Sequence, residues 1–235
     1  MKRLLAAGCS RIFQICKCFR RHERGDRHLP EMTMLEWYRS AADYRDLMTD
    51  CEGLLLSLTE TGLLHVNGQA IDLTPPWPRL TLAAAFQRYA PISLDHALAD
   101  DLFEEILVRD IEPHLGQGAP VFLCDYPASQ ASLSRLHPDN PALAERFELY
   151  VNGVELANGF SELTDTCEQR QRFRREQEII SALGRQPGPM PEPFLADLAR
   201  MPAAAGVALG VDRLVMLFTG ANRIDQVVAF TPEGL

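Results

Sequence analysis

Apolar and polar residues alternate in two neighbouring segments near the start of the chain. Residues 11–19, RIFQICKCF, and residues 32–38, MTMLEWY, are rich in the β-branched and aromatic side chains that are typical of strands. Gly25, Pro30 and many charged residues lie between them, as expected for a loop. The pattern therefore predicts an antiparallel hairpin with a long loop.

The second strand of this hairpin places a carboxylate on a half-buried face. Alternate residues of a strand point to opposite sides of the sheet, so Glu36 and Tyr38 project together. Burial of an unpaired carboxylate is unfavourable, so Glu36 either faces water or binds a cation. The cation could be the ammonium group of a ligand or an arginine of the chain such as Arg39 or Arg45, and this segment alone does not decide between them.

A second hairpin is predicted over residues 146–160, RFELYVNGVELANGF, where an Asn-Gly pair interrupts the alternation. A two-residue turn would pair Glu148 with Ala157 and make Glu148 and Glu155 diagonal neighbours on one face. Such neighbours are about 7–8 Å apart at the backbone, close enough for both carboxylates to reach one divalent ion. The alternative is a pair of solvated carboxylates. The opposite face is apolar and is expected to pack on a core through Phe147, Leu149, Val151, Val154 and Leu156.

The strict alternation ends at Asn158-Gly159, where we predict a bulge or a kink that re-aims Asn158, Phe160 and Glu162. Further along, residues 203–213, AAAGVALGVDR, contain glycines that allow a backbone or a ligand to approach closely. Glycines beside helices also commonly serve packing alone. Arg213 opens an apolar helical segment.

The remaining pattern alternates helices with short strands. Apolar spacing of three and four residues predicts a core-facing helix over 44–58, and an Asn-Gly pair predicts a short hairpin within 63–73. Hairpins combined with segregated helices indicate the α+β class. Further expected elements are helices near 81–89 and 93–110, a buried strand within 119–128, a helix over 165–183 and a turn-rich break at 184–193.

Composition indicates a globular protein, since 46% of the 235 residues are hydrophobic. Lys and Arg number 23 against 32 Asp and Glu, and the net charge of −9 argues against a protein held to nucleic acid mainly by bulk electrostatics. Residues 1–30 reverse this balance, with eight basic side chains against Glu23 and Asp26. A polyanion such as a nucleotide could bind there, and a solvated basic loop is the plainer alternative.

The first residues, MKRLLAAGC, resemble a lipoprotein export signal, but their apolar run covers only Leu4 to Ala7. A secretory signal needs about 7–15 apolar residues and a membrane span about 20. We therefore expect a cytoplasmic protein with no membrane partner. The six cysteines form no CxxC pair and no zinc-type spacing, so free thiols are expected.

Three segments taken together resemble class II aminoacyl-tRNA synthetases of the lysyl type. They are residues 19–39, FRRHERGDRHLPEMTMLEWYR, residues 147–163, FELYVNGVELANGFSEL, and residues 206–217, GVALGVDRLVML. The phrases MLEWYR, YPASQASL and GVALGVDRLVML are more similar to the stand-alone paralogues of this family, the elongation factor P (R)-β-lysine ligases.

The resemblance implies an α+β class II synthetase catalytic core, with an antiparallel sheet flanked by helices, as one domain over 1–235. Motif 2 of the family corresponds to 11–39 and motif 3 to 206–219. The dimer-forming motif 1 and a TSPE-like loop of the family are expected to precede Met1, so the chain is interpreted as an amino-terminally shortened form that lacks the motif 1 segment.

The resemblance also implies ATP and Mg²⁺ as cofactors and assigns roles to residues. Arg20 and Arg213 would be catalytic, with Arg20 on the α-phosphate of ATP and Arg213 on its phosphate tail, and Glu148 and Glu155 would hold the metal. The implied nucleotide contacts are Arg20, Arg21, His22, Leu29, Met32, Glu155, Leu156, Gly210 and Arg213. The implied pocket for a lysine-like amino acid consists of Glu36, Tyr38, Asn158, Phe160, Glu162 and Ala208.

Four positions depart from lysyl-tRNA synthetases. His22 stands where the family usually has an acidic residue, Leu29 replaces an asparagine, and Met32 replaces a phenylalanine that stacks on adenine. Ala208 stands where lysyl-tRNA synthetases have glycine, and one methyl group in a tight pocket changes discrimination by about 1–3 kcal/mol. Ala208 therefore favours a β-amino acid over α-lysine.

The expected function is ATP-dependent activation of (R)-β-lysine and its transfer to a lysine side chain of elongation factor P. The resemblance also implies a homodimer and makes tRNA an unlikely partner. Two alternatives are a fragment of a lysyl-tRNA synthetase that charges tRNA and a non-catalytic truncated paralogue.

Overall fold

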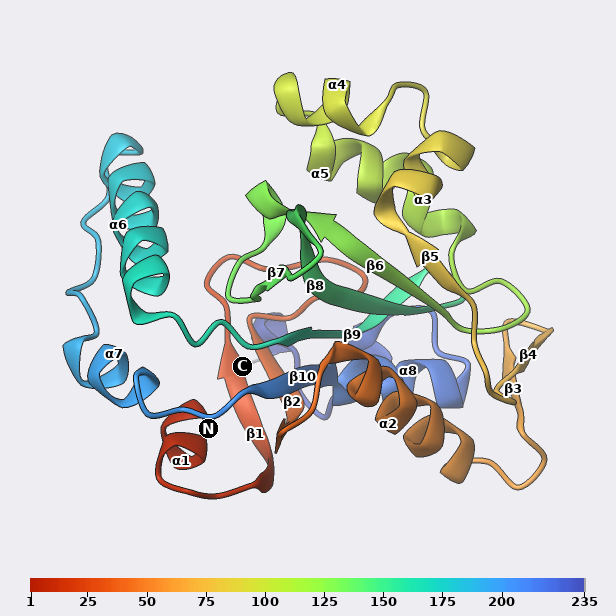
Figure 1. The fold of residues 1–235 in the computed structure, drawn as a ribbon. Coiled ribbons are helices and arrows are strands. Elements are labelled where there is room, and N and C mark those ends of the chain that lie inside the picture. Colours follow the sequence, from red (N-terminus) through yellow and green to blue (C-terminus); the bar gives the residue numbers. More distant parts are fainter. Residues whose placement is uncertain (235) are drawn as a thin grey trace.

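One large sheet organises the computed structural model, which describes residues 1–234 (Figure 1). Its strands follow the order β1-β2-β10-β9-β8-β6-β5, with β7 paired to β8, and a separate two-stranded sheet joins β3 to β4. Of these pairings, β5 with β6 is parallel and the rest are antiparallel. The strands are β1 (Arg11–Phe19), β2 (Glu31–Ser40), β3 (Leu63–Val66), β4 (Gln69–Asp72), β5 (Arg79–Thr81), β6 (Val121–Pro127), β7 (Leu136–His137), β8 (Asn140–Val151), β9 (Val154–Ser161) and β10 (Ala204–Gly210).

Helices flank this sheet, as the α+β class requires. In Figure 1, α3, α4 and α5 gather beside β5 and β6, whereas α1, α6 and α7 lie at the other side of the molecule. The helices are α1 (Lys2–Ala6), α2 (Tyr44–Ser57), α3 (Leu82–Tyr89), α4 (Leu94–Ala99), α5 (Phe103–Ile106), α6 (Thr166–Ala182), α7 (Glu192–Leu198) and α8 (Val211–Thr219). The expected fold class is confirmed.

The two faces of the sheet have different compositions. Helices α2 and α8 pack against one face of the sheet and form the largest apolar cluster with it. Strand β8 contributes Phe147, Leu149 and Val151 to this cluster, and β10 contributes Val207 and Leu209. Because strand side chains alternate, the residues between these project from the opposite face. That opposite face is where the polar residues singled out in the sequence lie.

Several elements agree closely with the hydrophobic pattern. The first hairpin pairs Arg11 with Arg39 at one end and Phe19 with Glu31 at the other. The helix expected over 44–58 is α2, whose first turn is capped by the side chain of Asp43. The helix expected over 165–183 is α6, and Asp165 caps it in the same way.

The helical segment expected near 93–110 is helical but interrupted. The chain forms α4 and α5, and α5 leads directly into a π-helical turn at Leu107–Ile111. The break lies between them, where Asp101 adopts a positive φ of 57° that a continuing right-handed helix does not allow. The short elements α1, β5 and α7 were not expected from the sequence.

The register of the second hairpin also differs from the prediction. Tyr150 pairs with Glu155 as expected, but Leu149 pairs with Ala157 and Glu148 with Asn158. Leu156 is therefore the extra residue of a bulge, which lies before the break predicted at Asn158-Gly159. The consequence for the side chains is the expected one, because one extra residue returns Asn158 to the face that carries Glu155.

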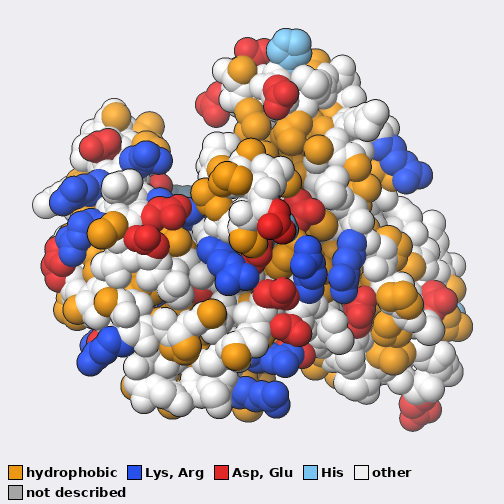
Figure 2. Space-filling view, in the orientation of Figure 1, with side chains coloured by type: hydrophobic (Ala, Val, Ile, Leu, Met, Phe, Trp, Pro, Cys, Tyr) orange, Lys and Arg blue, Asp and Glu red, His pale blue; other side chains and the backbone are white. Residues whose placement is uncertain are grey.

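No helix in the described part of the chain is long and apolar enough to cross a membrane. The six cysteines are free, as the absence of paired spacings predicts. On the face shown in Figure 2, acidic and basic side chains are intermixed, and a notch separates the part that contains α6 from the part that contains α4.

Candidate active site

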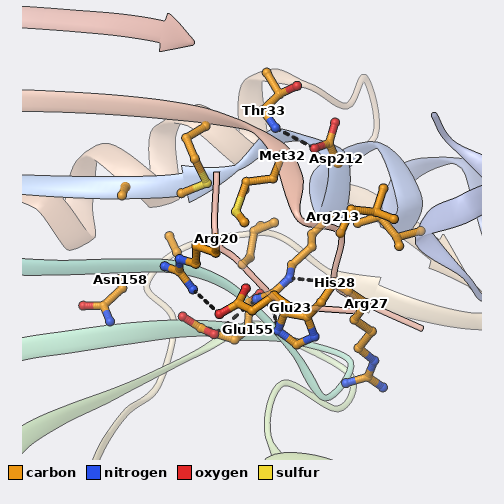
Figure 3. A pocket seen from close by; sticks show the side chains of 17 residues that line it. Arg20, Glu23, Arg27, His28, Met32, Thr33, Glu155, Asn158, Asp212 and Arg213 are labelled. Atoms are coloured by element: carbon orange, nitrogen blue, oxygen red, sulfur yellow. Dashed lines mark hydrogen bonds and ion pairs between the residues drawn. The ribbon is translucent and has the colours of Figure 1, made fainter. Parts of the chain in front are cut away.

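Two neighbouring cavities lie along β2, β9 and β10. Both are lined by Arg20, Asn158 and Ala208. The first cavity extends toward the start of α8 and the 20–30 loop, and Figure 3 shows its lining. The second extends toward α1 and contains Glu36, Tyr38, Phe160 and Glu162.

The loop between β1 and β2 brings cationic side chains to the first cavity. The loop is closed by a hydrogen bond from the Arg20 amide to the Pro30 carbonyl of 2.9 Å. Its tip is held by the Ile224 amide, which donates to the Asp26 carbonyl at 2.8 Å. Arg24 adds an ion pair with Asp225 at 2.9 Å. These contacts fix the loop against the segment after α8.

Arg213 lies on the same wall, in the first turn of α8. Its guanidinium donates to the backbone carbonyl of Glu155 at 2.7 Å and to the Glu155 carboxylate at 3.2 Å. It also contacts the Nε2 atom of His28, which must accept because a guanidinium only donates. Burial and the charge of Arg213 lower the pKa of His28, so this ring is neutral near pH 7.

Arg20 is available to a ligand in both cavities. Its side chain is 61% exposed, and it makes one ion pair within the described residues, with Glu23 at 3.2 Å. In Figure 3 the Arg20 and Glu23 side chains meet above Glu155. An exposed guanidinium with a single weak partner can reorient toward a phosphate at little cost.

Glu148 and Glu155 share a face, as the hairpin geometry predicted. Glu148 is 6% exposed and accepts hydrogen bonds from Arg146 at 2.6 Å, Tyr150 at 2.8 Å and Asn158 at 3.2 Å. Burial and the nearby charge of Glu148 raise the pKa of Glu155 to about 7. The solvated pair considered from the sequence is therefore wrong for Glu148.

These two carboxylates fit a divalent cation. Each keeps acceptor capacity beyond the hydrogen bonds that the structure records, because a carboxylate offers about four acceptor positions. Their mutual repulsion would be relieved by an oxygen-seeking cation such as Mg²⁺. Within residues 1–234, no cluster of three or more His, Cys, Asp or Glu side chains has metal-binding geometry, so phosphate oxygens and water would complete such a site.

The second cavity contains two further carboxylates, Glu36 and Glu162. The Nε2 atom of Gln14 donates to Glu36 at 3.0 Å, whereas Arg39 pairs with Asp50 at 2.8 Å. The internal salt bridge with Arg39 considered from the sequence is therefore not formed. Glu36 remains open to a cation from the cavity.

Glu162 lies deeper, and its side chain is 0% exposed. Burial raises its pKa to about 7, although the ammonium of Lys2 opposes this rise from 2.5 Å away. Burial and the neighbouring Glu162 and Glu36 carboxylates raise the pKa of Tyr38, so its phenol is neutral and can donate a hydrogen bond.

Gly206 makes room for this arrangement. A Cβ atom at Gly206 would lie 2.3 Å from a ring carbon of Tyr38 and 2.7 Å from the Glu162 carboxylate. Real Cβ atoms do not approach other atoms so closely. The small-residue run of β10 therefore lets Tyr38 and Glu162 meet over the strand.

The structure brings most of the predicted site residues together. Arg21 and His22 are exposed, and neither lines a cavity among the described residues. At His22 a positive φ of 68° turns the chain, and the next residue, Glu23, faces the cavity. The predicted residues that line the first cavity are Arg20, Leu29, Met32, Glu155, Leu156, Gly210 and Arg213.

Other cavity residues were missed by sequence reasoning. Glu23, Arg27 and His28 belong to the same loop as Arg20, which was assigned to the phosphate. Their position at the first cavity could therefore have been inferred from the loop. Lys2 and Arg146 line the second cavity, and nothing in the local sequence around Lys2 indicates this position.

Comparison with known proteins agrees with this geometry. Residues 1–233 match the family described as class II tRNA synthetases (D, K and N). The chain belongs to this class II tRNA synthetase family. The resemblance drawn from the three sequence segments is thereby confirmed.

Several curated proteins with similar sequences carry the name elongation factor P (R)-β-lysine ligase. The Klebsiella pneumoniae subsp. pneumoniae protein is 41% identical over 256 residues, and the Salmonella typhi protein is 43% identical over 246 residues. The Edwardsiella ictaluri protein is 42% identical over 246 residues. Each alignment covers 99% of this class II synthetase chain and 75% of the relative.

Proposed function

We propose that this chain activates (R)-β-lysine with ATP and transfers it to a lysine side chain of elongation factor P. The observation that carries the proposal is that Arg20 lines two adjoining cavities with different binding groups. The first contains Arg27 and Arg213, suited to phosphates, besides the carboxylates of Glu23, Glu155 and Asp212. The second contains Glu36 and Glu162, suited to ammonium groups, besides Lys2 and Arg146. The name shared by the similar ligases supplies the substrates.

In the first step, an oxygen of the amino-acid carboxylate attacks the α-phosphorus of ATP. A new P–O bond forms, the bond to pyrophosphate breaks, and an aminoacyl-adenylate results. Arg20, which lines both cavities, would stabilise the negative charge that develops on the α-phosphate. Arg213 and His28 would hold the phosphates that leave.

Glu148 and Glu155 would hold Mg²⁺ against the phosphates. A bound Mg²⁺ neutralises phosphate charge and orients the leaving group. Arg146 and Tyr150 position the Glu148 carboxylate through the hydrogen bonds described above.

In the second step, the amine of a lysine side chain of elongation factor P attacks the acyl carbon of the adenylate. A C–N bond forms, the C–O bond to AMP breaks, and the amine loses its proton to solvent. The products are AMP and an amide on elongation factor P. We propose that one catalytic domain over residues 1–235 carries out both steps, in a cytoplasmic homodimer.

Amino-acid selection would depend on Glu36, Tyr38, Phe160 and Glu162, with Ala208 on the shared wall. The carboxylates and the aromatic ring recognise ammonium groups, and the Ala208 methyl group occupies space at the boundary between the cavities. We propose that this methyl group disfavours α-lysine and suits a β-amino acid.

ATP–pyrophosphate exchange tests the proposal. We expect exchange to depend on (R)-β-lysine and to exceed that with α-lysine. Exchange with α-lysine together with charging of tRNA would instead identify a lysyl-tRNA synthetase. Absence of exchange with either amino acid, in protein that is folded by circular dichroism, would contradict both enzyme functions.

A further inference from the structure

The chain places one of its own ammonium groups inside the second cavity. The Nζ atom of Lys2 lies 2.5 Å from the Glu162 carboxylate and 5.2 Å from the centre of the Phe160 ring. The Lys2 side chain is 13% exposed, and that of Glu162 is 0% exposed. Lys2 is thus enclosed within the group of residues assigned to substrate recognition.

The surroundings of Lys2 are those of a binding site for an alkylammonium ion. A carboxylate, an aromatic face and neighbouring polar groups are the elements with which proteins bind such ions. Glu36 and Tyr38 line the same cavity as Lys2. A lysine side chain and a lysine-like amino acid carry the same terminal group, so both satisfy this subsite.

Two ammonium groups cannot occupy the subsite together. At a separation of a few ångströms in a partly desolvated cavity, their repulsion is strong. The ammonium group of a substrate can therefore bind to Glu162 only after the Lys2 side chain has left the subsite.

Helix α1 can keep its place while Lys2 withdraws. Leu5 of this helix is 1% exposed and packs with Leu195 and Leu198 of α7. Arg3 adds an ion pair with Asp197 at 2.5 Å. Lys2 carries its charge on a flexible four-carbon side chain in the first turn, so its rotamer can change without undocking Leu5.

We infer that Lys2 is an internal occupant of the ammonium subsite and that a lysine-like amino acid binds by displacing its side chain from Glu162 and Phe160. This inference rests on the proposed function. Displacement of Lys2 raises the KM for the amino acid without affecting the later chemical steps. Lys2 then acts as an internal competitor that weakly binding amines fail to displace.

The test compares Lys2→Met with Arg3→Met. Met keeps the length of the side chain without its charge. Arg3→Met removes an ion pair of the same helix outside the cavity, so it controls for altered docking of α1. Removal of Lys2 favours protonation of Glu162, so all proteins are assayed at pH 8.5, above the pKa of about 7 that this carboxylate has in the unaltered chain.

We expect Lys2→Met to lower the amino-acid KM in ATP–pyrophosphate exchange about three- to tenfold, because occupation of a site reduces apparent affinity by the fraction of molecules in which it is free. We expect kcat to stay unchanged, and Arg3→Met to change neither value. An unchanged KM in Lys2→Met would overturn the inference. A higher KM would also overturn it, because it would show that Lys2 helps to bind the substrate.

Calorimetric binding of n-pentylamine gives a readout that does not depend on catalysis. This amine carries the ammonium group and no carboxylate, and we expect it to bind Lys2→Met more tightly than the unaltered chain. If it does so while no amino acid supports exchange, the subsite inference stands and the proposed function fails. If exchange occurs but n-pentylamine binds both proteins equally, the inference alone fails.

Discussion

The two cavities that meet at Arg20 have different kinds of wall. The first is lined by Arg20, Arg27, His28 and Arg213, carried by a loop and a helix start that hydrogen bonds hold in place. The second places carboxylates on β2 and just after β9, and a side chain of the first helix closes it.

The two cavities also differ in how far their charged side chains are exposed to solvent. Arg20 is 61% exposed and weakly paired, so it can meet an incoming phosphate, whereas Glu162 is fully enclosed and already paired with Lys2. On the proposed function, a nucleotide would enter an open site, whereas an amino acid would replace an internal partner. Because both cavities lie along β2, β9 and β10, the proposed function would bring the substrate carboxylate and the α-phosphate to the same arginine.

Removal of the shared arginine should have the largest effect. We expect Arg20→Ala to lower kcat of ATP–pyrophosphate exchange by about 10²–10³, the range for loss of one group that stabilises transition-state charge. Arg21→Ala is the matched control, because Arg21 is adjacent in sequence, exposed and outside both cavities. Equal losses in the two variants would refute a special role for the shared position.

Alteration of the shared wall should change the choice of amino acid. We expect Ala208→Gly to shift the ratio of kcat/KM values for (R)-β-lysine and α-lysine toward α-lysine by about 10–200-fold, the usual effect of one carbon in a tight pocket. Exchange assays with each amino acid at saturating ATP measure the ratio. The KM for ATP should be nearly unchanged. If the ratio of kcat/KM values for the two amino acids stays constant, Ala208 does not determine the selectivity.

The pH dependence should separate the second cavity from the first. The pKa of Glu162 is raised to about 7, and only its ionised form attracts an ammonium group. Affinity is therefore present above this pKa and lost as pH falls through it, and we expect the amino-acid KM to rise about tenfold from pH 8 to pH 6. Saturating ATP and Mg²⁺ limit the contribution of Glu155. Glu162→Gln should bind weakly and without this pH dependence, and a similar pH profile in that variant would assign the titration to another group.

A smaller effect is expected on stability. In Gly206→Ala the new methyl group collides with Tyr38 and Glu162, and overpacking of this kind costs about 1–3 kcal/mol. Urea denaturation measures this loss in the free energy of unfolding. Gly188→Ala is the control, since a Cβ atom there meets no neighbour within 4 Å. Equal stabilities would mean that β10 can shift to make room.

The shared faces were predictable because strand geometry is local. Alternation in β8 and β9 was enough to place Glu148 and Glu155 on one face of the sheet. Alternation in β2 was enough to place Glu36 and Tyr38 on one face. The bulge at Leu156 was misplaced, because an extra residue in a ladder depends on both strands and leaves no mark in the alternation of either.

Long-range packing was not predictable in the same way. Lys2 reaches its cavity because Leu5 packs against α7, nearly the whole chain away in sequence. The local sequence does not reveal this position, because a basic residue before a short apolar run also resembles an export signal. The positive φ at His22 likewise sends Glu23, rather than His22, to the cavity.

The central claim is that the two cavities together activate an amino acid and deliver it to a protein. Intact-mass spectrometry of elongation factor P, incubated with this chain, Mg²⁺, ATP and (R)-β-lysine, tests it most directly. We predict the addition of one β-lysyl group that requires ATP, is lost in Arg20→Ala and persists in Arg21→Ala. An unchanged mass of elongation factor P, under conditions in which the same protein sample catalyses ATP–pyrophosphate exchange, would contradict the claim.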